Sequence, residues 1–397
     1  MIALKRGLPG ATLWPLAAVG VWLAAALVGG PIHPADLPFT TWPRPWSQGS
    51  ERGLGDVTDD GPHILWHDAE RATVIQLCSG ELARRELVAR SDTLRFRDLC
   101  GGAATYQVPV DPHDPEPHEF SDVDRVFAVS DIHGEYRALI DLLRRAGIID
   151  DVLSWAWGDG HLVVNGDVFD RGDHVTECLW LIHRLEREAA EAGGRVHFVL
   201  GNHEVMVMRG DLRYVNEKYL EGIVRRSGIE YEDLFGPDME LGRWLRGKNA
   251  AVKIDSVLYV HGGLAPRALQ LGLDLADVNA GVRRLIDARS YLIAFDDTLG
   301  FLLGGEGPLW YRGYHEAMEG RYPMASEGDV LGVLDRYGAR AVVVGHTEIA
   351  RVEPLQGGRV FAIDVPVKEL GGLQGLLWAD GRFYRVDTNG ARTPLDD

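Results

Sequence analysis

The sequence predicts an α/β protein, because short apolar runs rich in β-branched residues alternate with stretches of helical periodicity over most of the chain. The first such pair is RVFAVS at 125–130 and EYRALIDLLRRAGI at 135–148. The second pair is HLVV at 161–164 and the periodic stretch 174–192. Between 63 and 110, by contrast, only short strand-like runs separated by turns occur. We therefore expect a large α/β domain preceded by a small β-rich module.

Length and charge set limits on function. The chain has 397 residues, of which 46% are apolar, enough for one large domain and a smaller appendage. Its net charge of −18 argues against nucleic acid as a partner, because sequence-independent nucleic-acid binding depends on basic side chains that neutralise phosphates. An acidic protein that handles phosphate must supply positive charge locally, from bound metals or from a few placed arginines.

Residues 1–30 predict export from the cytoplasm. Lys5 and Arg6 precede an uncharged run, 11–30, that is rich in Ala, Leu, Val and Trp. This pattern is typical of a signal peptide. An uncleaved membrane anchor is the alternative, because such an anchor needs about 20 apolar residues. Either interpretation places the remaining chain in the periplasm or outside the cell, free or attached to the inner membrane.

The residues after the export signal predict a linker and then the β-rich accessory module. The linker is the Pro-, Gly- and Asp-rich stretch 31–61, and the module, 62–110, contains five short apolar runs. Cys78 and Cys100 lie within the module and are candidates for a disulfide in an oxidising compartment, a pairing that the sequence leaves open. Cys178 lies on an apolar helical pattern, which predicts a buried free thiol.

A Pro- and acid-rich stretch, 111–122, predicts a second linker, which leaves 123–397 for the large α/β domain. Residues 214–248 are expected to be helical and rich in surface positions. Further strands are expected at 196–200, 256–260, 340–344 and 360–365, followed by a hairpin at 373–386.

Five of the predicted strands end in short polar motifs. These are DIHG at 131–134, GDVFDRG at 166–172, GNHE at 201–204, HGG at 261–263 and GHT at 345–347. Because ligands of α/β sheets collect beyond the carboxyl ends of strands, we expect the motifs to converge. They supply six side chains of metal-ligand type: Asp131, His133, Asp167, Asn202, His261 and His346. Carboxylate, amide and imidazole together suit Mn, Fe or Zn, and six ligands suit two divalent ions that act on a phosphoryl group.

The ordered set DxH, GDxxDRG, GNHE, HGG and GHT resembles the calcineurin-like metallophosphatases of the phosphoprotein phosphatase superfamily. The stretch 232–249 and the sequence LWYR at 309–312 are most similar to the bacterial Shewanella-like branch of that superfamily. The resemblance covers 123–386 and implies the metallophosphatase fold, in which two mixed β-sheets form a sandwich flanked by helices. The first motif of the family is commonly GDIHG, and here Ser130 replaces its leading glycine, a change that we expect to be tolerated.

The resemblance implies how the ligands are shared between two metals. Asp131 and His133 would bind the first ion, and Asp167 would bridge both. The second ion would be bound by Asn202, His261 and His346.

The resemblance also implies four catalytic residues. His203 would protonate the leaving oxygen while Asp170 orients it, and Arg171 and Arg312 would hold phosphate oxygens. The residue types fit these roles, because arginine presents a planar fork to phosphate and a histidine held by a carboxylate is a competent proton donor. The implied reaction is direct attack of a metal-bridging hydroxide on a phosphomonoester of phosphotyrosine, phosphoserine or phosphothreonine.

Three other functions are compatible with parts of the sequence. One is hydrolysis of small phosphate esters or dinucleotide polyphosphates by the same centre, and another is binding of a phosphorylated ligand without turnover, against which the complete ligand set argues. The third is cysteine-dependent catalysis, because Cys78 and Arg84 have the C-x5-R spacing of thiolate phosphatases. That stretch contains only one glycine, whereas a phosphate-binding loop needs many free backbone amides, so we expect Cys78→Ser to keep activity and Asp167→Asn to abolish it.

Overall fold

The computed structural model describes residues 59–111, 113–318 and 322–395. The predicted export signal and all but the last residues of the linker expected at 31–61 lie outside these ranges. Within the described part of the chain, no helix combines the length and the apolar character that crossing a membrane requires.

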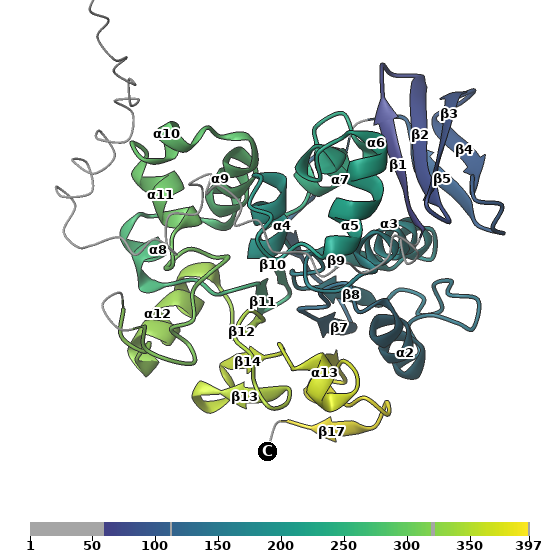
Figure 1. The fold of residues 1–397 in the computed structure, drawn as a ribbon. Helices are drawn as coiled ribbons and strands as arrows, with labels where there is room; N and C mark the ends of the chain where they lie inside the picture. Colours follow the sequence, from purple (N-terminus) through teal and green to yellow (C-terminus); the bar gives the residue numbers. More distant parts are fainter. Residues whose placement is uncertain (1–58, 112, 319–321, 396–397) are drawn as a thin grey trace, which may run out of the picture. The chain divides into compact units, whose positions relative to one another are not determined.

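Two six-stranded sheets form the core of the catalytic domain (Figure 1). The first consists, in spatial order, of β17 (Arg392–Pro394), β16 (Arg382–Val386), β15 (Gly375–Ala379), β7 (Arg125–Val129), β8 (His161–Val164) and β9 (Arg195–Phe198). The second consists of β13 (Glu353–Leu355), β14 (Val360–Ala362), β12 (Ala341–Val344), β11 (Val257–Val260), β10 (Ala251–Ile254) and β6 (Glu119–Phe120). Both sheets are mixed, because parallel neighbours such as β7 and β8 stand beside antiparallel ones such as β7 and β15.

The two sheets pack face to face through one apolar core. Val126, Ala128 and Val163 of the first sheet belong to the same buried cluster as Tyr259 and Val343 of the second. The motif-bearing strands are apolar along nearly their whole length because the opposite face of each sheet is also covered. The sandwich of two mixed sheets that the family resemblance implied is therefore confirmed.

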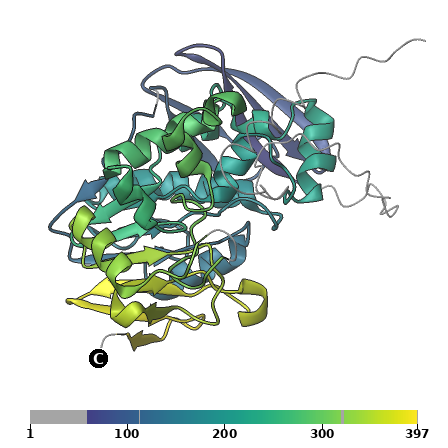
Figure 2. The same ribbon diagram turned by 90° about the vertical axis from the view of Figure 1, so that its left-hand side faces the viewer.

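Helices cover the outer faces of the sandwich. In Figure 1, α2 (Tyr136–Ala146) and α3 (Val175–Glu191) lie to the right, beside β7 to β9. On the left lie α8 (Pro266–Gln270), α9 (Leu275–Asp287), α10 (Ser290–Ile293), α11 (Asp297–Leu303) and α12 (Glu327–Tyr337). Figure 2 brings this second group to the front. The predicted pairing of strands with amphipathic helices is thus confirmed for 125–192.

Residues 214–248 contain helical structure, as the sequence predicts. It is divided into short pieces: α5 (Glu217–Tyr219), η3 (Leu220–Val224), α6 (Arg225–Ser227), η4 (Glu232–Phe235) and α7 (Glu240–Arg246). The first three pieces end at Gly228, which adopts a left-handed conformation with φ of 72° that glycine tolerates. Residues 214–230 are mostly exposed or half-buried, as expected, whereas most of 239–248 is buried, with Trp244 almost fully so.

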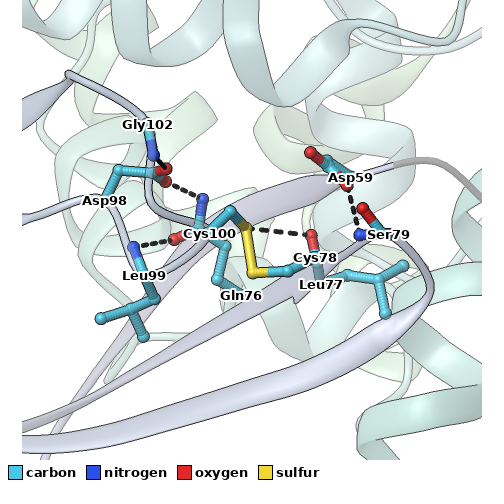
Figure 3. Close-up of a disulfide and its surroundings, with 9 residues drawn as sticks. All are labelled: Asp59, Gln76, Leu77, Cys78, Ser79, Asp98, Leu99, Cys100 and Gly102. Carbon is cyan, nitrogen blue, oxygen red and sulfur yellow. Dashed lines mark hydrogen bonds between the residues drawn. A yellow bond between two sulfur atoms is a disulfide. The ribbon is translucent and has the colours of Figure 1, made fainter.

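The N-terminal β-rich module is present. It comprises β1 (Asp60–Trp66), β2 (Arg71–Cys78), β3 (Glu81–Val88), β4 (Thr93–Arg97) and β5 (Thr105–Pro109). Its first three strands form one antiparallel sheet and its last two form a hairpin. Cys78 and Cys100 are joined by a disulfide that connects the end of β2 to the turn after β4 (Figure 3). Cys178 is a buried free thiol on α3, as predicted.

The segment 111–122, expected to be a linker, makes specific contacts with the catalytic domain over its described residues. Glu119 and Phe120 form β6, which pairs in parallel with β10 at the edge of the second sheet. Glu116 pairs with the ammonium group of the buried Lys248. Extended backbone and placed charges let this Pro-rich segment add to the sheet without a strand-like apolar pattern.

Candidate metal centre and active site

The loops that carry the five motifs meet at the carboxyl ends of the central strands of both sheets. The strands β7, β8 and β9 are parallel neighbours, so the DIHG, GDVFDRG and GNHE loops leave the first sheet side by side. The strands β11 and β12, also parallel neighbours, deliver the HGG and GHT loops from the second sheet. Hydrogen bonds tie the loops together across the sandwich: Asn165 Nδ2 donates to the carbonyl of Val260 at 3.2 Å, and the His346 amide donates to Asp131 Oδ2 at 3.1 Å.

The backbone of these loops is strained. A non-glycine residue in the left-handed region costs about 1–2 kcal/mol, and such residues cluster at functional sites. Six motif residues have φ between 46° and 69°: Asp131, His133, Asp167, Asp170, Arg171 and His346. The surrounding contacts must therefore hold the loops in a conformation that brings these side chains to one point.

Asp167 is the side chain shared by two groups of metal-ligand atoms. It lies with His133 and His203 in one group and with His261 and His346 in the other, and within each group the ligand atoms are within 4.8 Å of one another. Its Oδ2 is 3.1 Å from His261 Nε2 and 3.7 Å from His203 Nε2. A carboxylate in this position has the geometry to serve two neighbouring ions.

Three histidines are oriented as metal ligands. The Nδ1 atoms of His133 and His261 lie 2.7 Å from the carbonyl of Phe169 and 2.8 Å from that of Asn165, so each donates its Nδ1 proton there and directs its Nε2 toward the site. The buried Nε2 atoms of His133 and His346 have no hydrogen-bond partner among the described residues. These orphaned nitrogens fit the metal ligation that the family implies.

The charge balance of the site also fits metal ions. Burial lowers the pKa of His133 to about 3, so its imidazole is neutral, the form that binds metals. Burial also lowers the pKa of His261, but the carboxylates of Asp167 and Asp131 outweigh it and raise that pKa to about 10. The two acids thus create a negative potential in the site that a bound cation would neutralise.

Asp131 and Asn202 complete the predicted ligand set. Asp131 Oδ2 accepts hydrogen bonds from the Ser130 hydroxyl at 2.6 Å and from the His346 amide, while its Oδ1 lies 3.9 Å from His133 Nε2. Ser130, which stands where the family commonly has glycine, is therefore part of the support of this ligand. Asn202, the first residue of α4 (Asn202–Met208), places its Oδ1 3.1 Å from His261 Nε2.

His203 and Asp170 form a buried pair next to these ligands. His203 Nδ1 lies 2.6 Å from Asp170 Oδ2, so Nε2 of the ring faces Asp167 and the ligand atoms. Burial lowers the pKa of His203, but the carboxylates of Asp167 and Asp170 outweigh it and raise this pKa above its ordinary value. The two carboxylates therefore favour the protonated imidazole, the form that can donate a proton toward the site.

The two predicted phosphate-binding arginines differ in how firmly they are held. Arg312 is half-buried, and its Nη1 donates to the carbonyl of His346 at 2.7 Å and to the hydroxyl of Thr347 at 3.3 Å. Arg171 is exposed, and its side chain forms no hydrogen bond or ion pair with another residue of the described ranges. Its backbone is fixed instead, because its amide donates to the carbonyl of Tyr214 at 3.0 Å.

The structure reveals Glu204 as a supporting residue to which sequence analysis assigned no role. It is fully buried, and its two oxygens accept hydrogen bonds from the amides of Gly201, Asp167, Val168 and Phe169 at 2.7 to 3.3 Å. Burial raises the pKa of Glu204 to about 7. The glutamate thus fixes the GDVFDRG and GNHE loops to one another. Its place directly after the motif histidine is the sequence signal that could have indicated this role.

Asp364 is a second residue that sequence analysis missed. It follows β14, the parallel neighbour of β12, so it emerges at the same edge as the motif loops. Burial and the nearby carboxylate of Asp131 raise the pKa of Asp364 well above its ordinary value. The five motifs were identified as polar residues that follow a buried strand. The same pattern occurs in 360–365 and could have identified Asp364.

Comparisons with known proteins identify the family of the chain. A sequence model of the calcineurin-like phosphoesterase family matches residues 124–349, more than half of the chain. The crystal structure of the cold-active protein-tyrosine phosphatase of a psychrophilic Shewanella species is 35% identical with a TM-score of 0.79, and the match covers 85% of this chain and 99% of that one.

Two further relatives carry the name of the same branch. Shewanella-like protein phosphatase 1 of Plasmodium berghei (strain Anka) is 30% identical over 227 residues, which are 56% of this chain and 61%, less than two thirds, of that protein. Shewanella-like protein phosphatase 2 of Arabidopsis thaliana is 28% identical over 306 residues, which are 64% of this chain and 75% of that protein. These matches confirm the resemblance to the Shewanella-like branch. The chain belongs to the calcineurin-like phosphoesterase family.

Proposed function

We propose that the chain is a metal-dependent phosphatase that hydrolyses phosphomonoesters on proteins. The observation that carries this proposal is the position of Asp167, which is shared by two groups of ligand atoms and lies beside the buried pair of His203 and Asp170. Ligands for two ions and a proton donor in one place suit transfer of a phosphoryl group to water.

Two divalent ions fit the site. Asp131, His133 and Asp167 would hold one, and Asp167 with Asn202, His261 and His346 the other. When bound, such ions supply Lewis acidity that polarises the phosphoryl group and lowers the pKa of water. Mn, Fe and Zn all suit this mixture of oxygen and nitrogen ligands.

His203 is the proposed general acid. The alkoxide or phenoxide that leaves phosphorus needs a proton, and the two carboxylates that raise the pKa of His203 favour its protonated form. Asp170 accepts the Nδ1 proton at 2.6 Å and so points Nε2 toward the reacting group. No covalent phosphoenzyme is required.

Arg312 and Arg171 are proposed to bind phosphate oxygens in different ways. Arg312 is preorganised by the carbonyl of His346 and the hydroxyl of Thr347, so it offers a fixed part of its guanidinium fork. Arg171 is exposed and projects from the same loop as Asp167, so it has freedom to adjust to the bound substrate. Together they neutralise charge that spreads over the phosphoryl oxygens in the transition state.

Phosphotyrosine is the proposed substrate class. The Shewanella structure that matches 85% of the chain is named a protein-tyrosine phosphatase, which supports this assignment. The relatives from Plasmodium and Arabidopsis are named protein phosphatases without a stated residue, so phosphoserine and phosphothreonine are the rival substrates.

The test is a panel of phosphopeptides of one sequence that differ only in phosphotyrosine, phosphoserine or phosphothreonine. The full-length chain is stripped with a chelator and reconstituted with Mn, Fe or Zn before each assay. We expect metal-dependent turnover of p-nitrophenyl phosphate and the highest kcat/KM on phosphotyrosine. Equal turnover by the stripped protein would contradict the metal mechanism. Turnover of only a small ester or a dinucleotide polyphosphate would show that the substrate is not a phosphoprotein.

We also propose that the chain acts outside the cytoplasm. The disulfide between Cys78 and Cys100 supports this proposal, because such bonds persist in oxidising compartments (Figure 3). Fractionation of cells that produce the full-length chain tests the location. Recovery of the protein in the cytosolic fraction with both thiols free would contradict it.

A further inference from the structure

A second group of metal-ligand side chains lies outside the active site. It consists of His113, His183 and Glu240. His113 belongs to the segment between β5 and β6, His183 lies on α3, and Glu240 is the first residue of α7. None of the motif loops contributes to it, so the group is independent of the proposed function.

The three ligand atoms point at one another. Glu240 Oε1 is 2.9 Å from His113 Nε2 and 3.4 Å from His183 Nε2, and all three atoms lie within 4.8 Å of one another. In a tetrahedral zinc site, bonds of about 2.0–2.2 Å separate neighbouring ligand atoms by about 3.3–3.5 Å. Small rotations of the imidazoles would therefore place an ion between them.

His183 has an unused ligand atom. Its side chain is 8% exposed, and its Nε2 has no hydrogen-bond partner among the described residues although it is aimed at Glu240. The rings of Trp180 and Trp244 pack against the imidazole edge-on, at centroid distances of 5.2 and 5.5 Å. A buried polar nitrogen left without a partner is unfavourable, and a bound ion would remove that cost.

Glu240 is a buried carboxylate that needs a positive partner. It is 0% exposed, and its Oε2 accepts a hydrogen bond from Trp66 Nε1 at 2.7 Å, which leaves Oε1 for the histidines. Both imidazoles face this same oxygen, but only His113 forms a hydrogen bond with it.

The basic side chains near Glu240 are engaged elsewhere. Lys248 binds Glu116 and Glu186, and Arg243 donates to the carbonyl of Val110 while its guanidinium lies over the Trp66 ring. Within the described ranges, neither forms an ion pair with Glu240. A buried charge without a full counterion is unfavourable, so the position favours a cation.

We propose that His113, His183 and Glu240 bind one divalent ion of zinc type, separate from the active site. Two imidazoles and one carboxylate are a ligand set that zinc uses, with a fourth position left for water. His113, whose side chain is 17% exposed, provides the route by which the ion enters. Because Trp66 of β1 holds the same glutamate, the ion would fasten the β-rich module and the segment after it to α3 and α7.

Cobalt binding tests the proposal in a chain whose active site is disabled. The full-length protein with Asp167→Asn and His346→Ala is stripped of metal, titrated with Co²⁺ and dialysed, and bound cobalt is measured by elemental analysis and by its visible absorption. We expect about one retained Co²⁺ per chain with the absorption of a tetrahedral site. Adding His183→Gln should remove it, whereas His161→Gln, at a histidine outside the group, should not.

Thermal stability provides the second readout. Zn²⁺ should raise the Tm of the disabled background, and His113→Gln should abolish that rise while leaving the Tm of the metal-free protein close to the background value. His113 lies in a loop, so this variant decides the question even if His183→Gln does not fold. Three results would each overturn the proposal and leave a hydrogen-bonded ion pair. They are no retained cobalt, equal retention of cobalt with His183→Gln and with His161→Gln, and a zinc-dependent rise in Tm that survives His113→Gln.

Discussion

The active-site loops and the contact between the β-rich module and helices α3 and α7 both bury charged side chains, but they assemble them differently. In the active site, each ligand lies within a few residues of the end of a strand. At the module contact, partners come from distant segments: Trp66 donates to Glu240, and Trp180 donates to the carbonyl of Pro62 at 2.9 Å. The position of each active-site ligand is therefore marked in the local sequence, whereas the residues of the module contact have no such local signal.

This difference separates catalysis from stability. The active site holds strained loops and ligand atoms without protein partners, which are useful only when substrate and ions arrive. The β-rich module at that contact holds pairs such as Asp60 and His63, which are buried within β1, lie 2.9 Å apart and support the fold directly. Changes in the first region should reduce turnover while the protein stays folded, and changes in the second should do the reverse.

The largest expected effect comes from Asp167→Asn. The amide keeps the size of the side chain but removes the charge that both ligand groups share, so we expect turnover of p-nitrophenyl phosphate to fall by about 10⁴-fold, since bound metals contribute several kcal/mol to catalysis. Steady-state kinetics with added Mn and elemental analysis of bound metal measure this. Asp159→Asn, at an exposed aspartate, is the control. Wild-type kcat in Asp167→Asn would refute the bridging role.

His203→Asn should lower kcat by about 10²- to 10³-fold, with a dependence on the leaving group. Phosphoserine peptides, whose alkoxide needs a proton, should lose more activity than p-nitrophenyl phosphate, whose phenolate leaves readily. Kinetics on the two substrates are compared for the variant and the wild-type protein. An equal loss on both would argue that His203 serves only to bind metal or phosphate.

His63→Leu tests the module contact. It leaves the buried carboxylate of Asp60 without its main partner, so we expect the free energy of unfolding to fall by about 3 kcal/mol. Denaturant titration measures this, and kcat of the folded protein should stay near that of the wild type. Arg71→Ala, which breaks the exposed pair with Asp68, should cost less than about 1 kcal/mol. Equal effects of the two variants would contradict the distinction between buried and exposed pairs.

The same pair predicts a dependence on pH. Burial raises the pKa of Asp60, but His63 outweighs it and holds the pKa below the ordinary 3.8. A lowered carboxyl pKa contributes stability that is present above the ordinary value and is lost as the pH falls beneath it. The difference in the free energy of unfolding between the wild type and His63→Leu should therefore shrink as the pH is lowered through 3.8. A difference that grows over this range would contradict the prediction.

Cys78→Ser should have the smallest effect on turnover. The thiol is tied up in a disulfide in the module, so kcat should stay unchanged, while losing the cross-link across 22 residues should cost about 3 kcal/mol of stability. Kinetics and denaturant titration of oxidised wild type and variant measure both. A loss of turnover in Cys78→Ser would revive the cysteine-dependent mechanism.

The sequence predicted the parts of the molecule that depend on local pattern. The alternation of apolar strands and amphipathic helices anticipated β7, β8, α2 and α3, and the strand-end motifs anticipated the residues that meet around Asp167. Glu204 and Asp364 were missed because their importance lies in which backbone amides and carboxylates they face. The surface positions expected over 214–248 are found in 214–230 but not in 239–248, where Trp244 and its neighbours are buried. The cluster of His113, His183 and Glu240 had no signal, because its members lie far apart in the chain.

Asn165 connects the packing of the core to the geometry of the metal centre. It follows β8 of the first sheet, yet its amide donates to Val260 and its carbonyl accepts from His261, both at the end of β11 in the second sheet. The distance between the two ligand groups is thereby coupled to the distance between the two sheets. Core side chains such as Val343, remote from any substrate, would thus help to tune which metal radius the centre accepts.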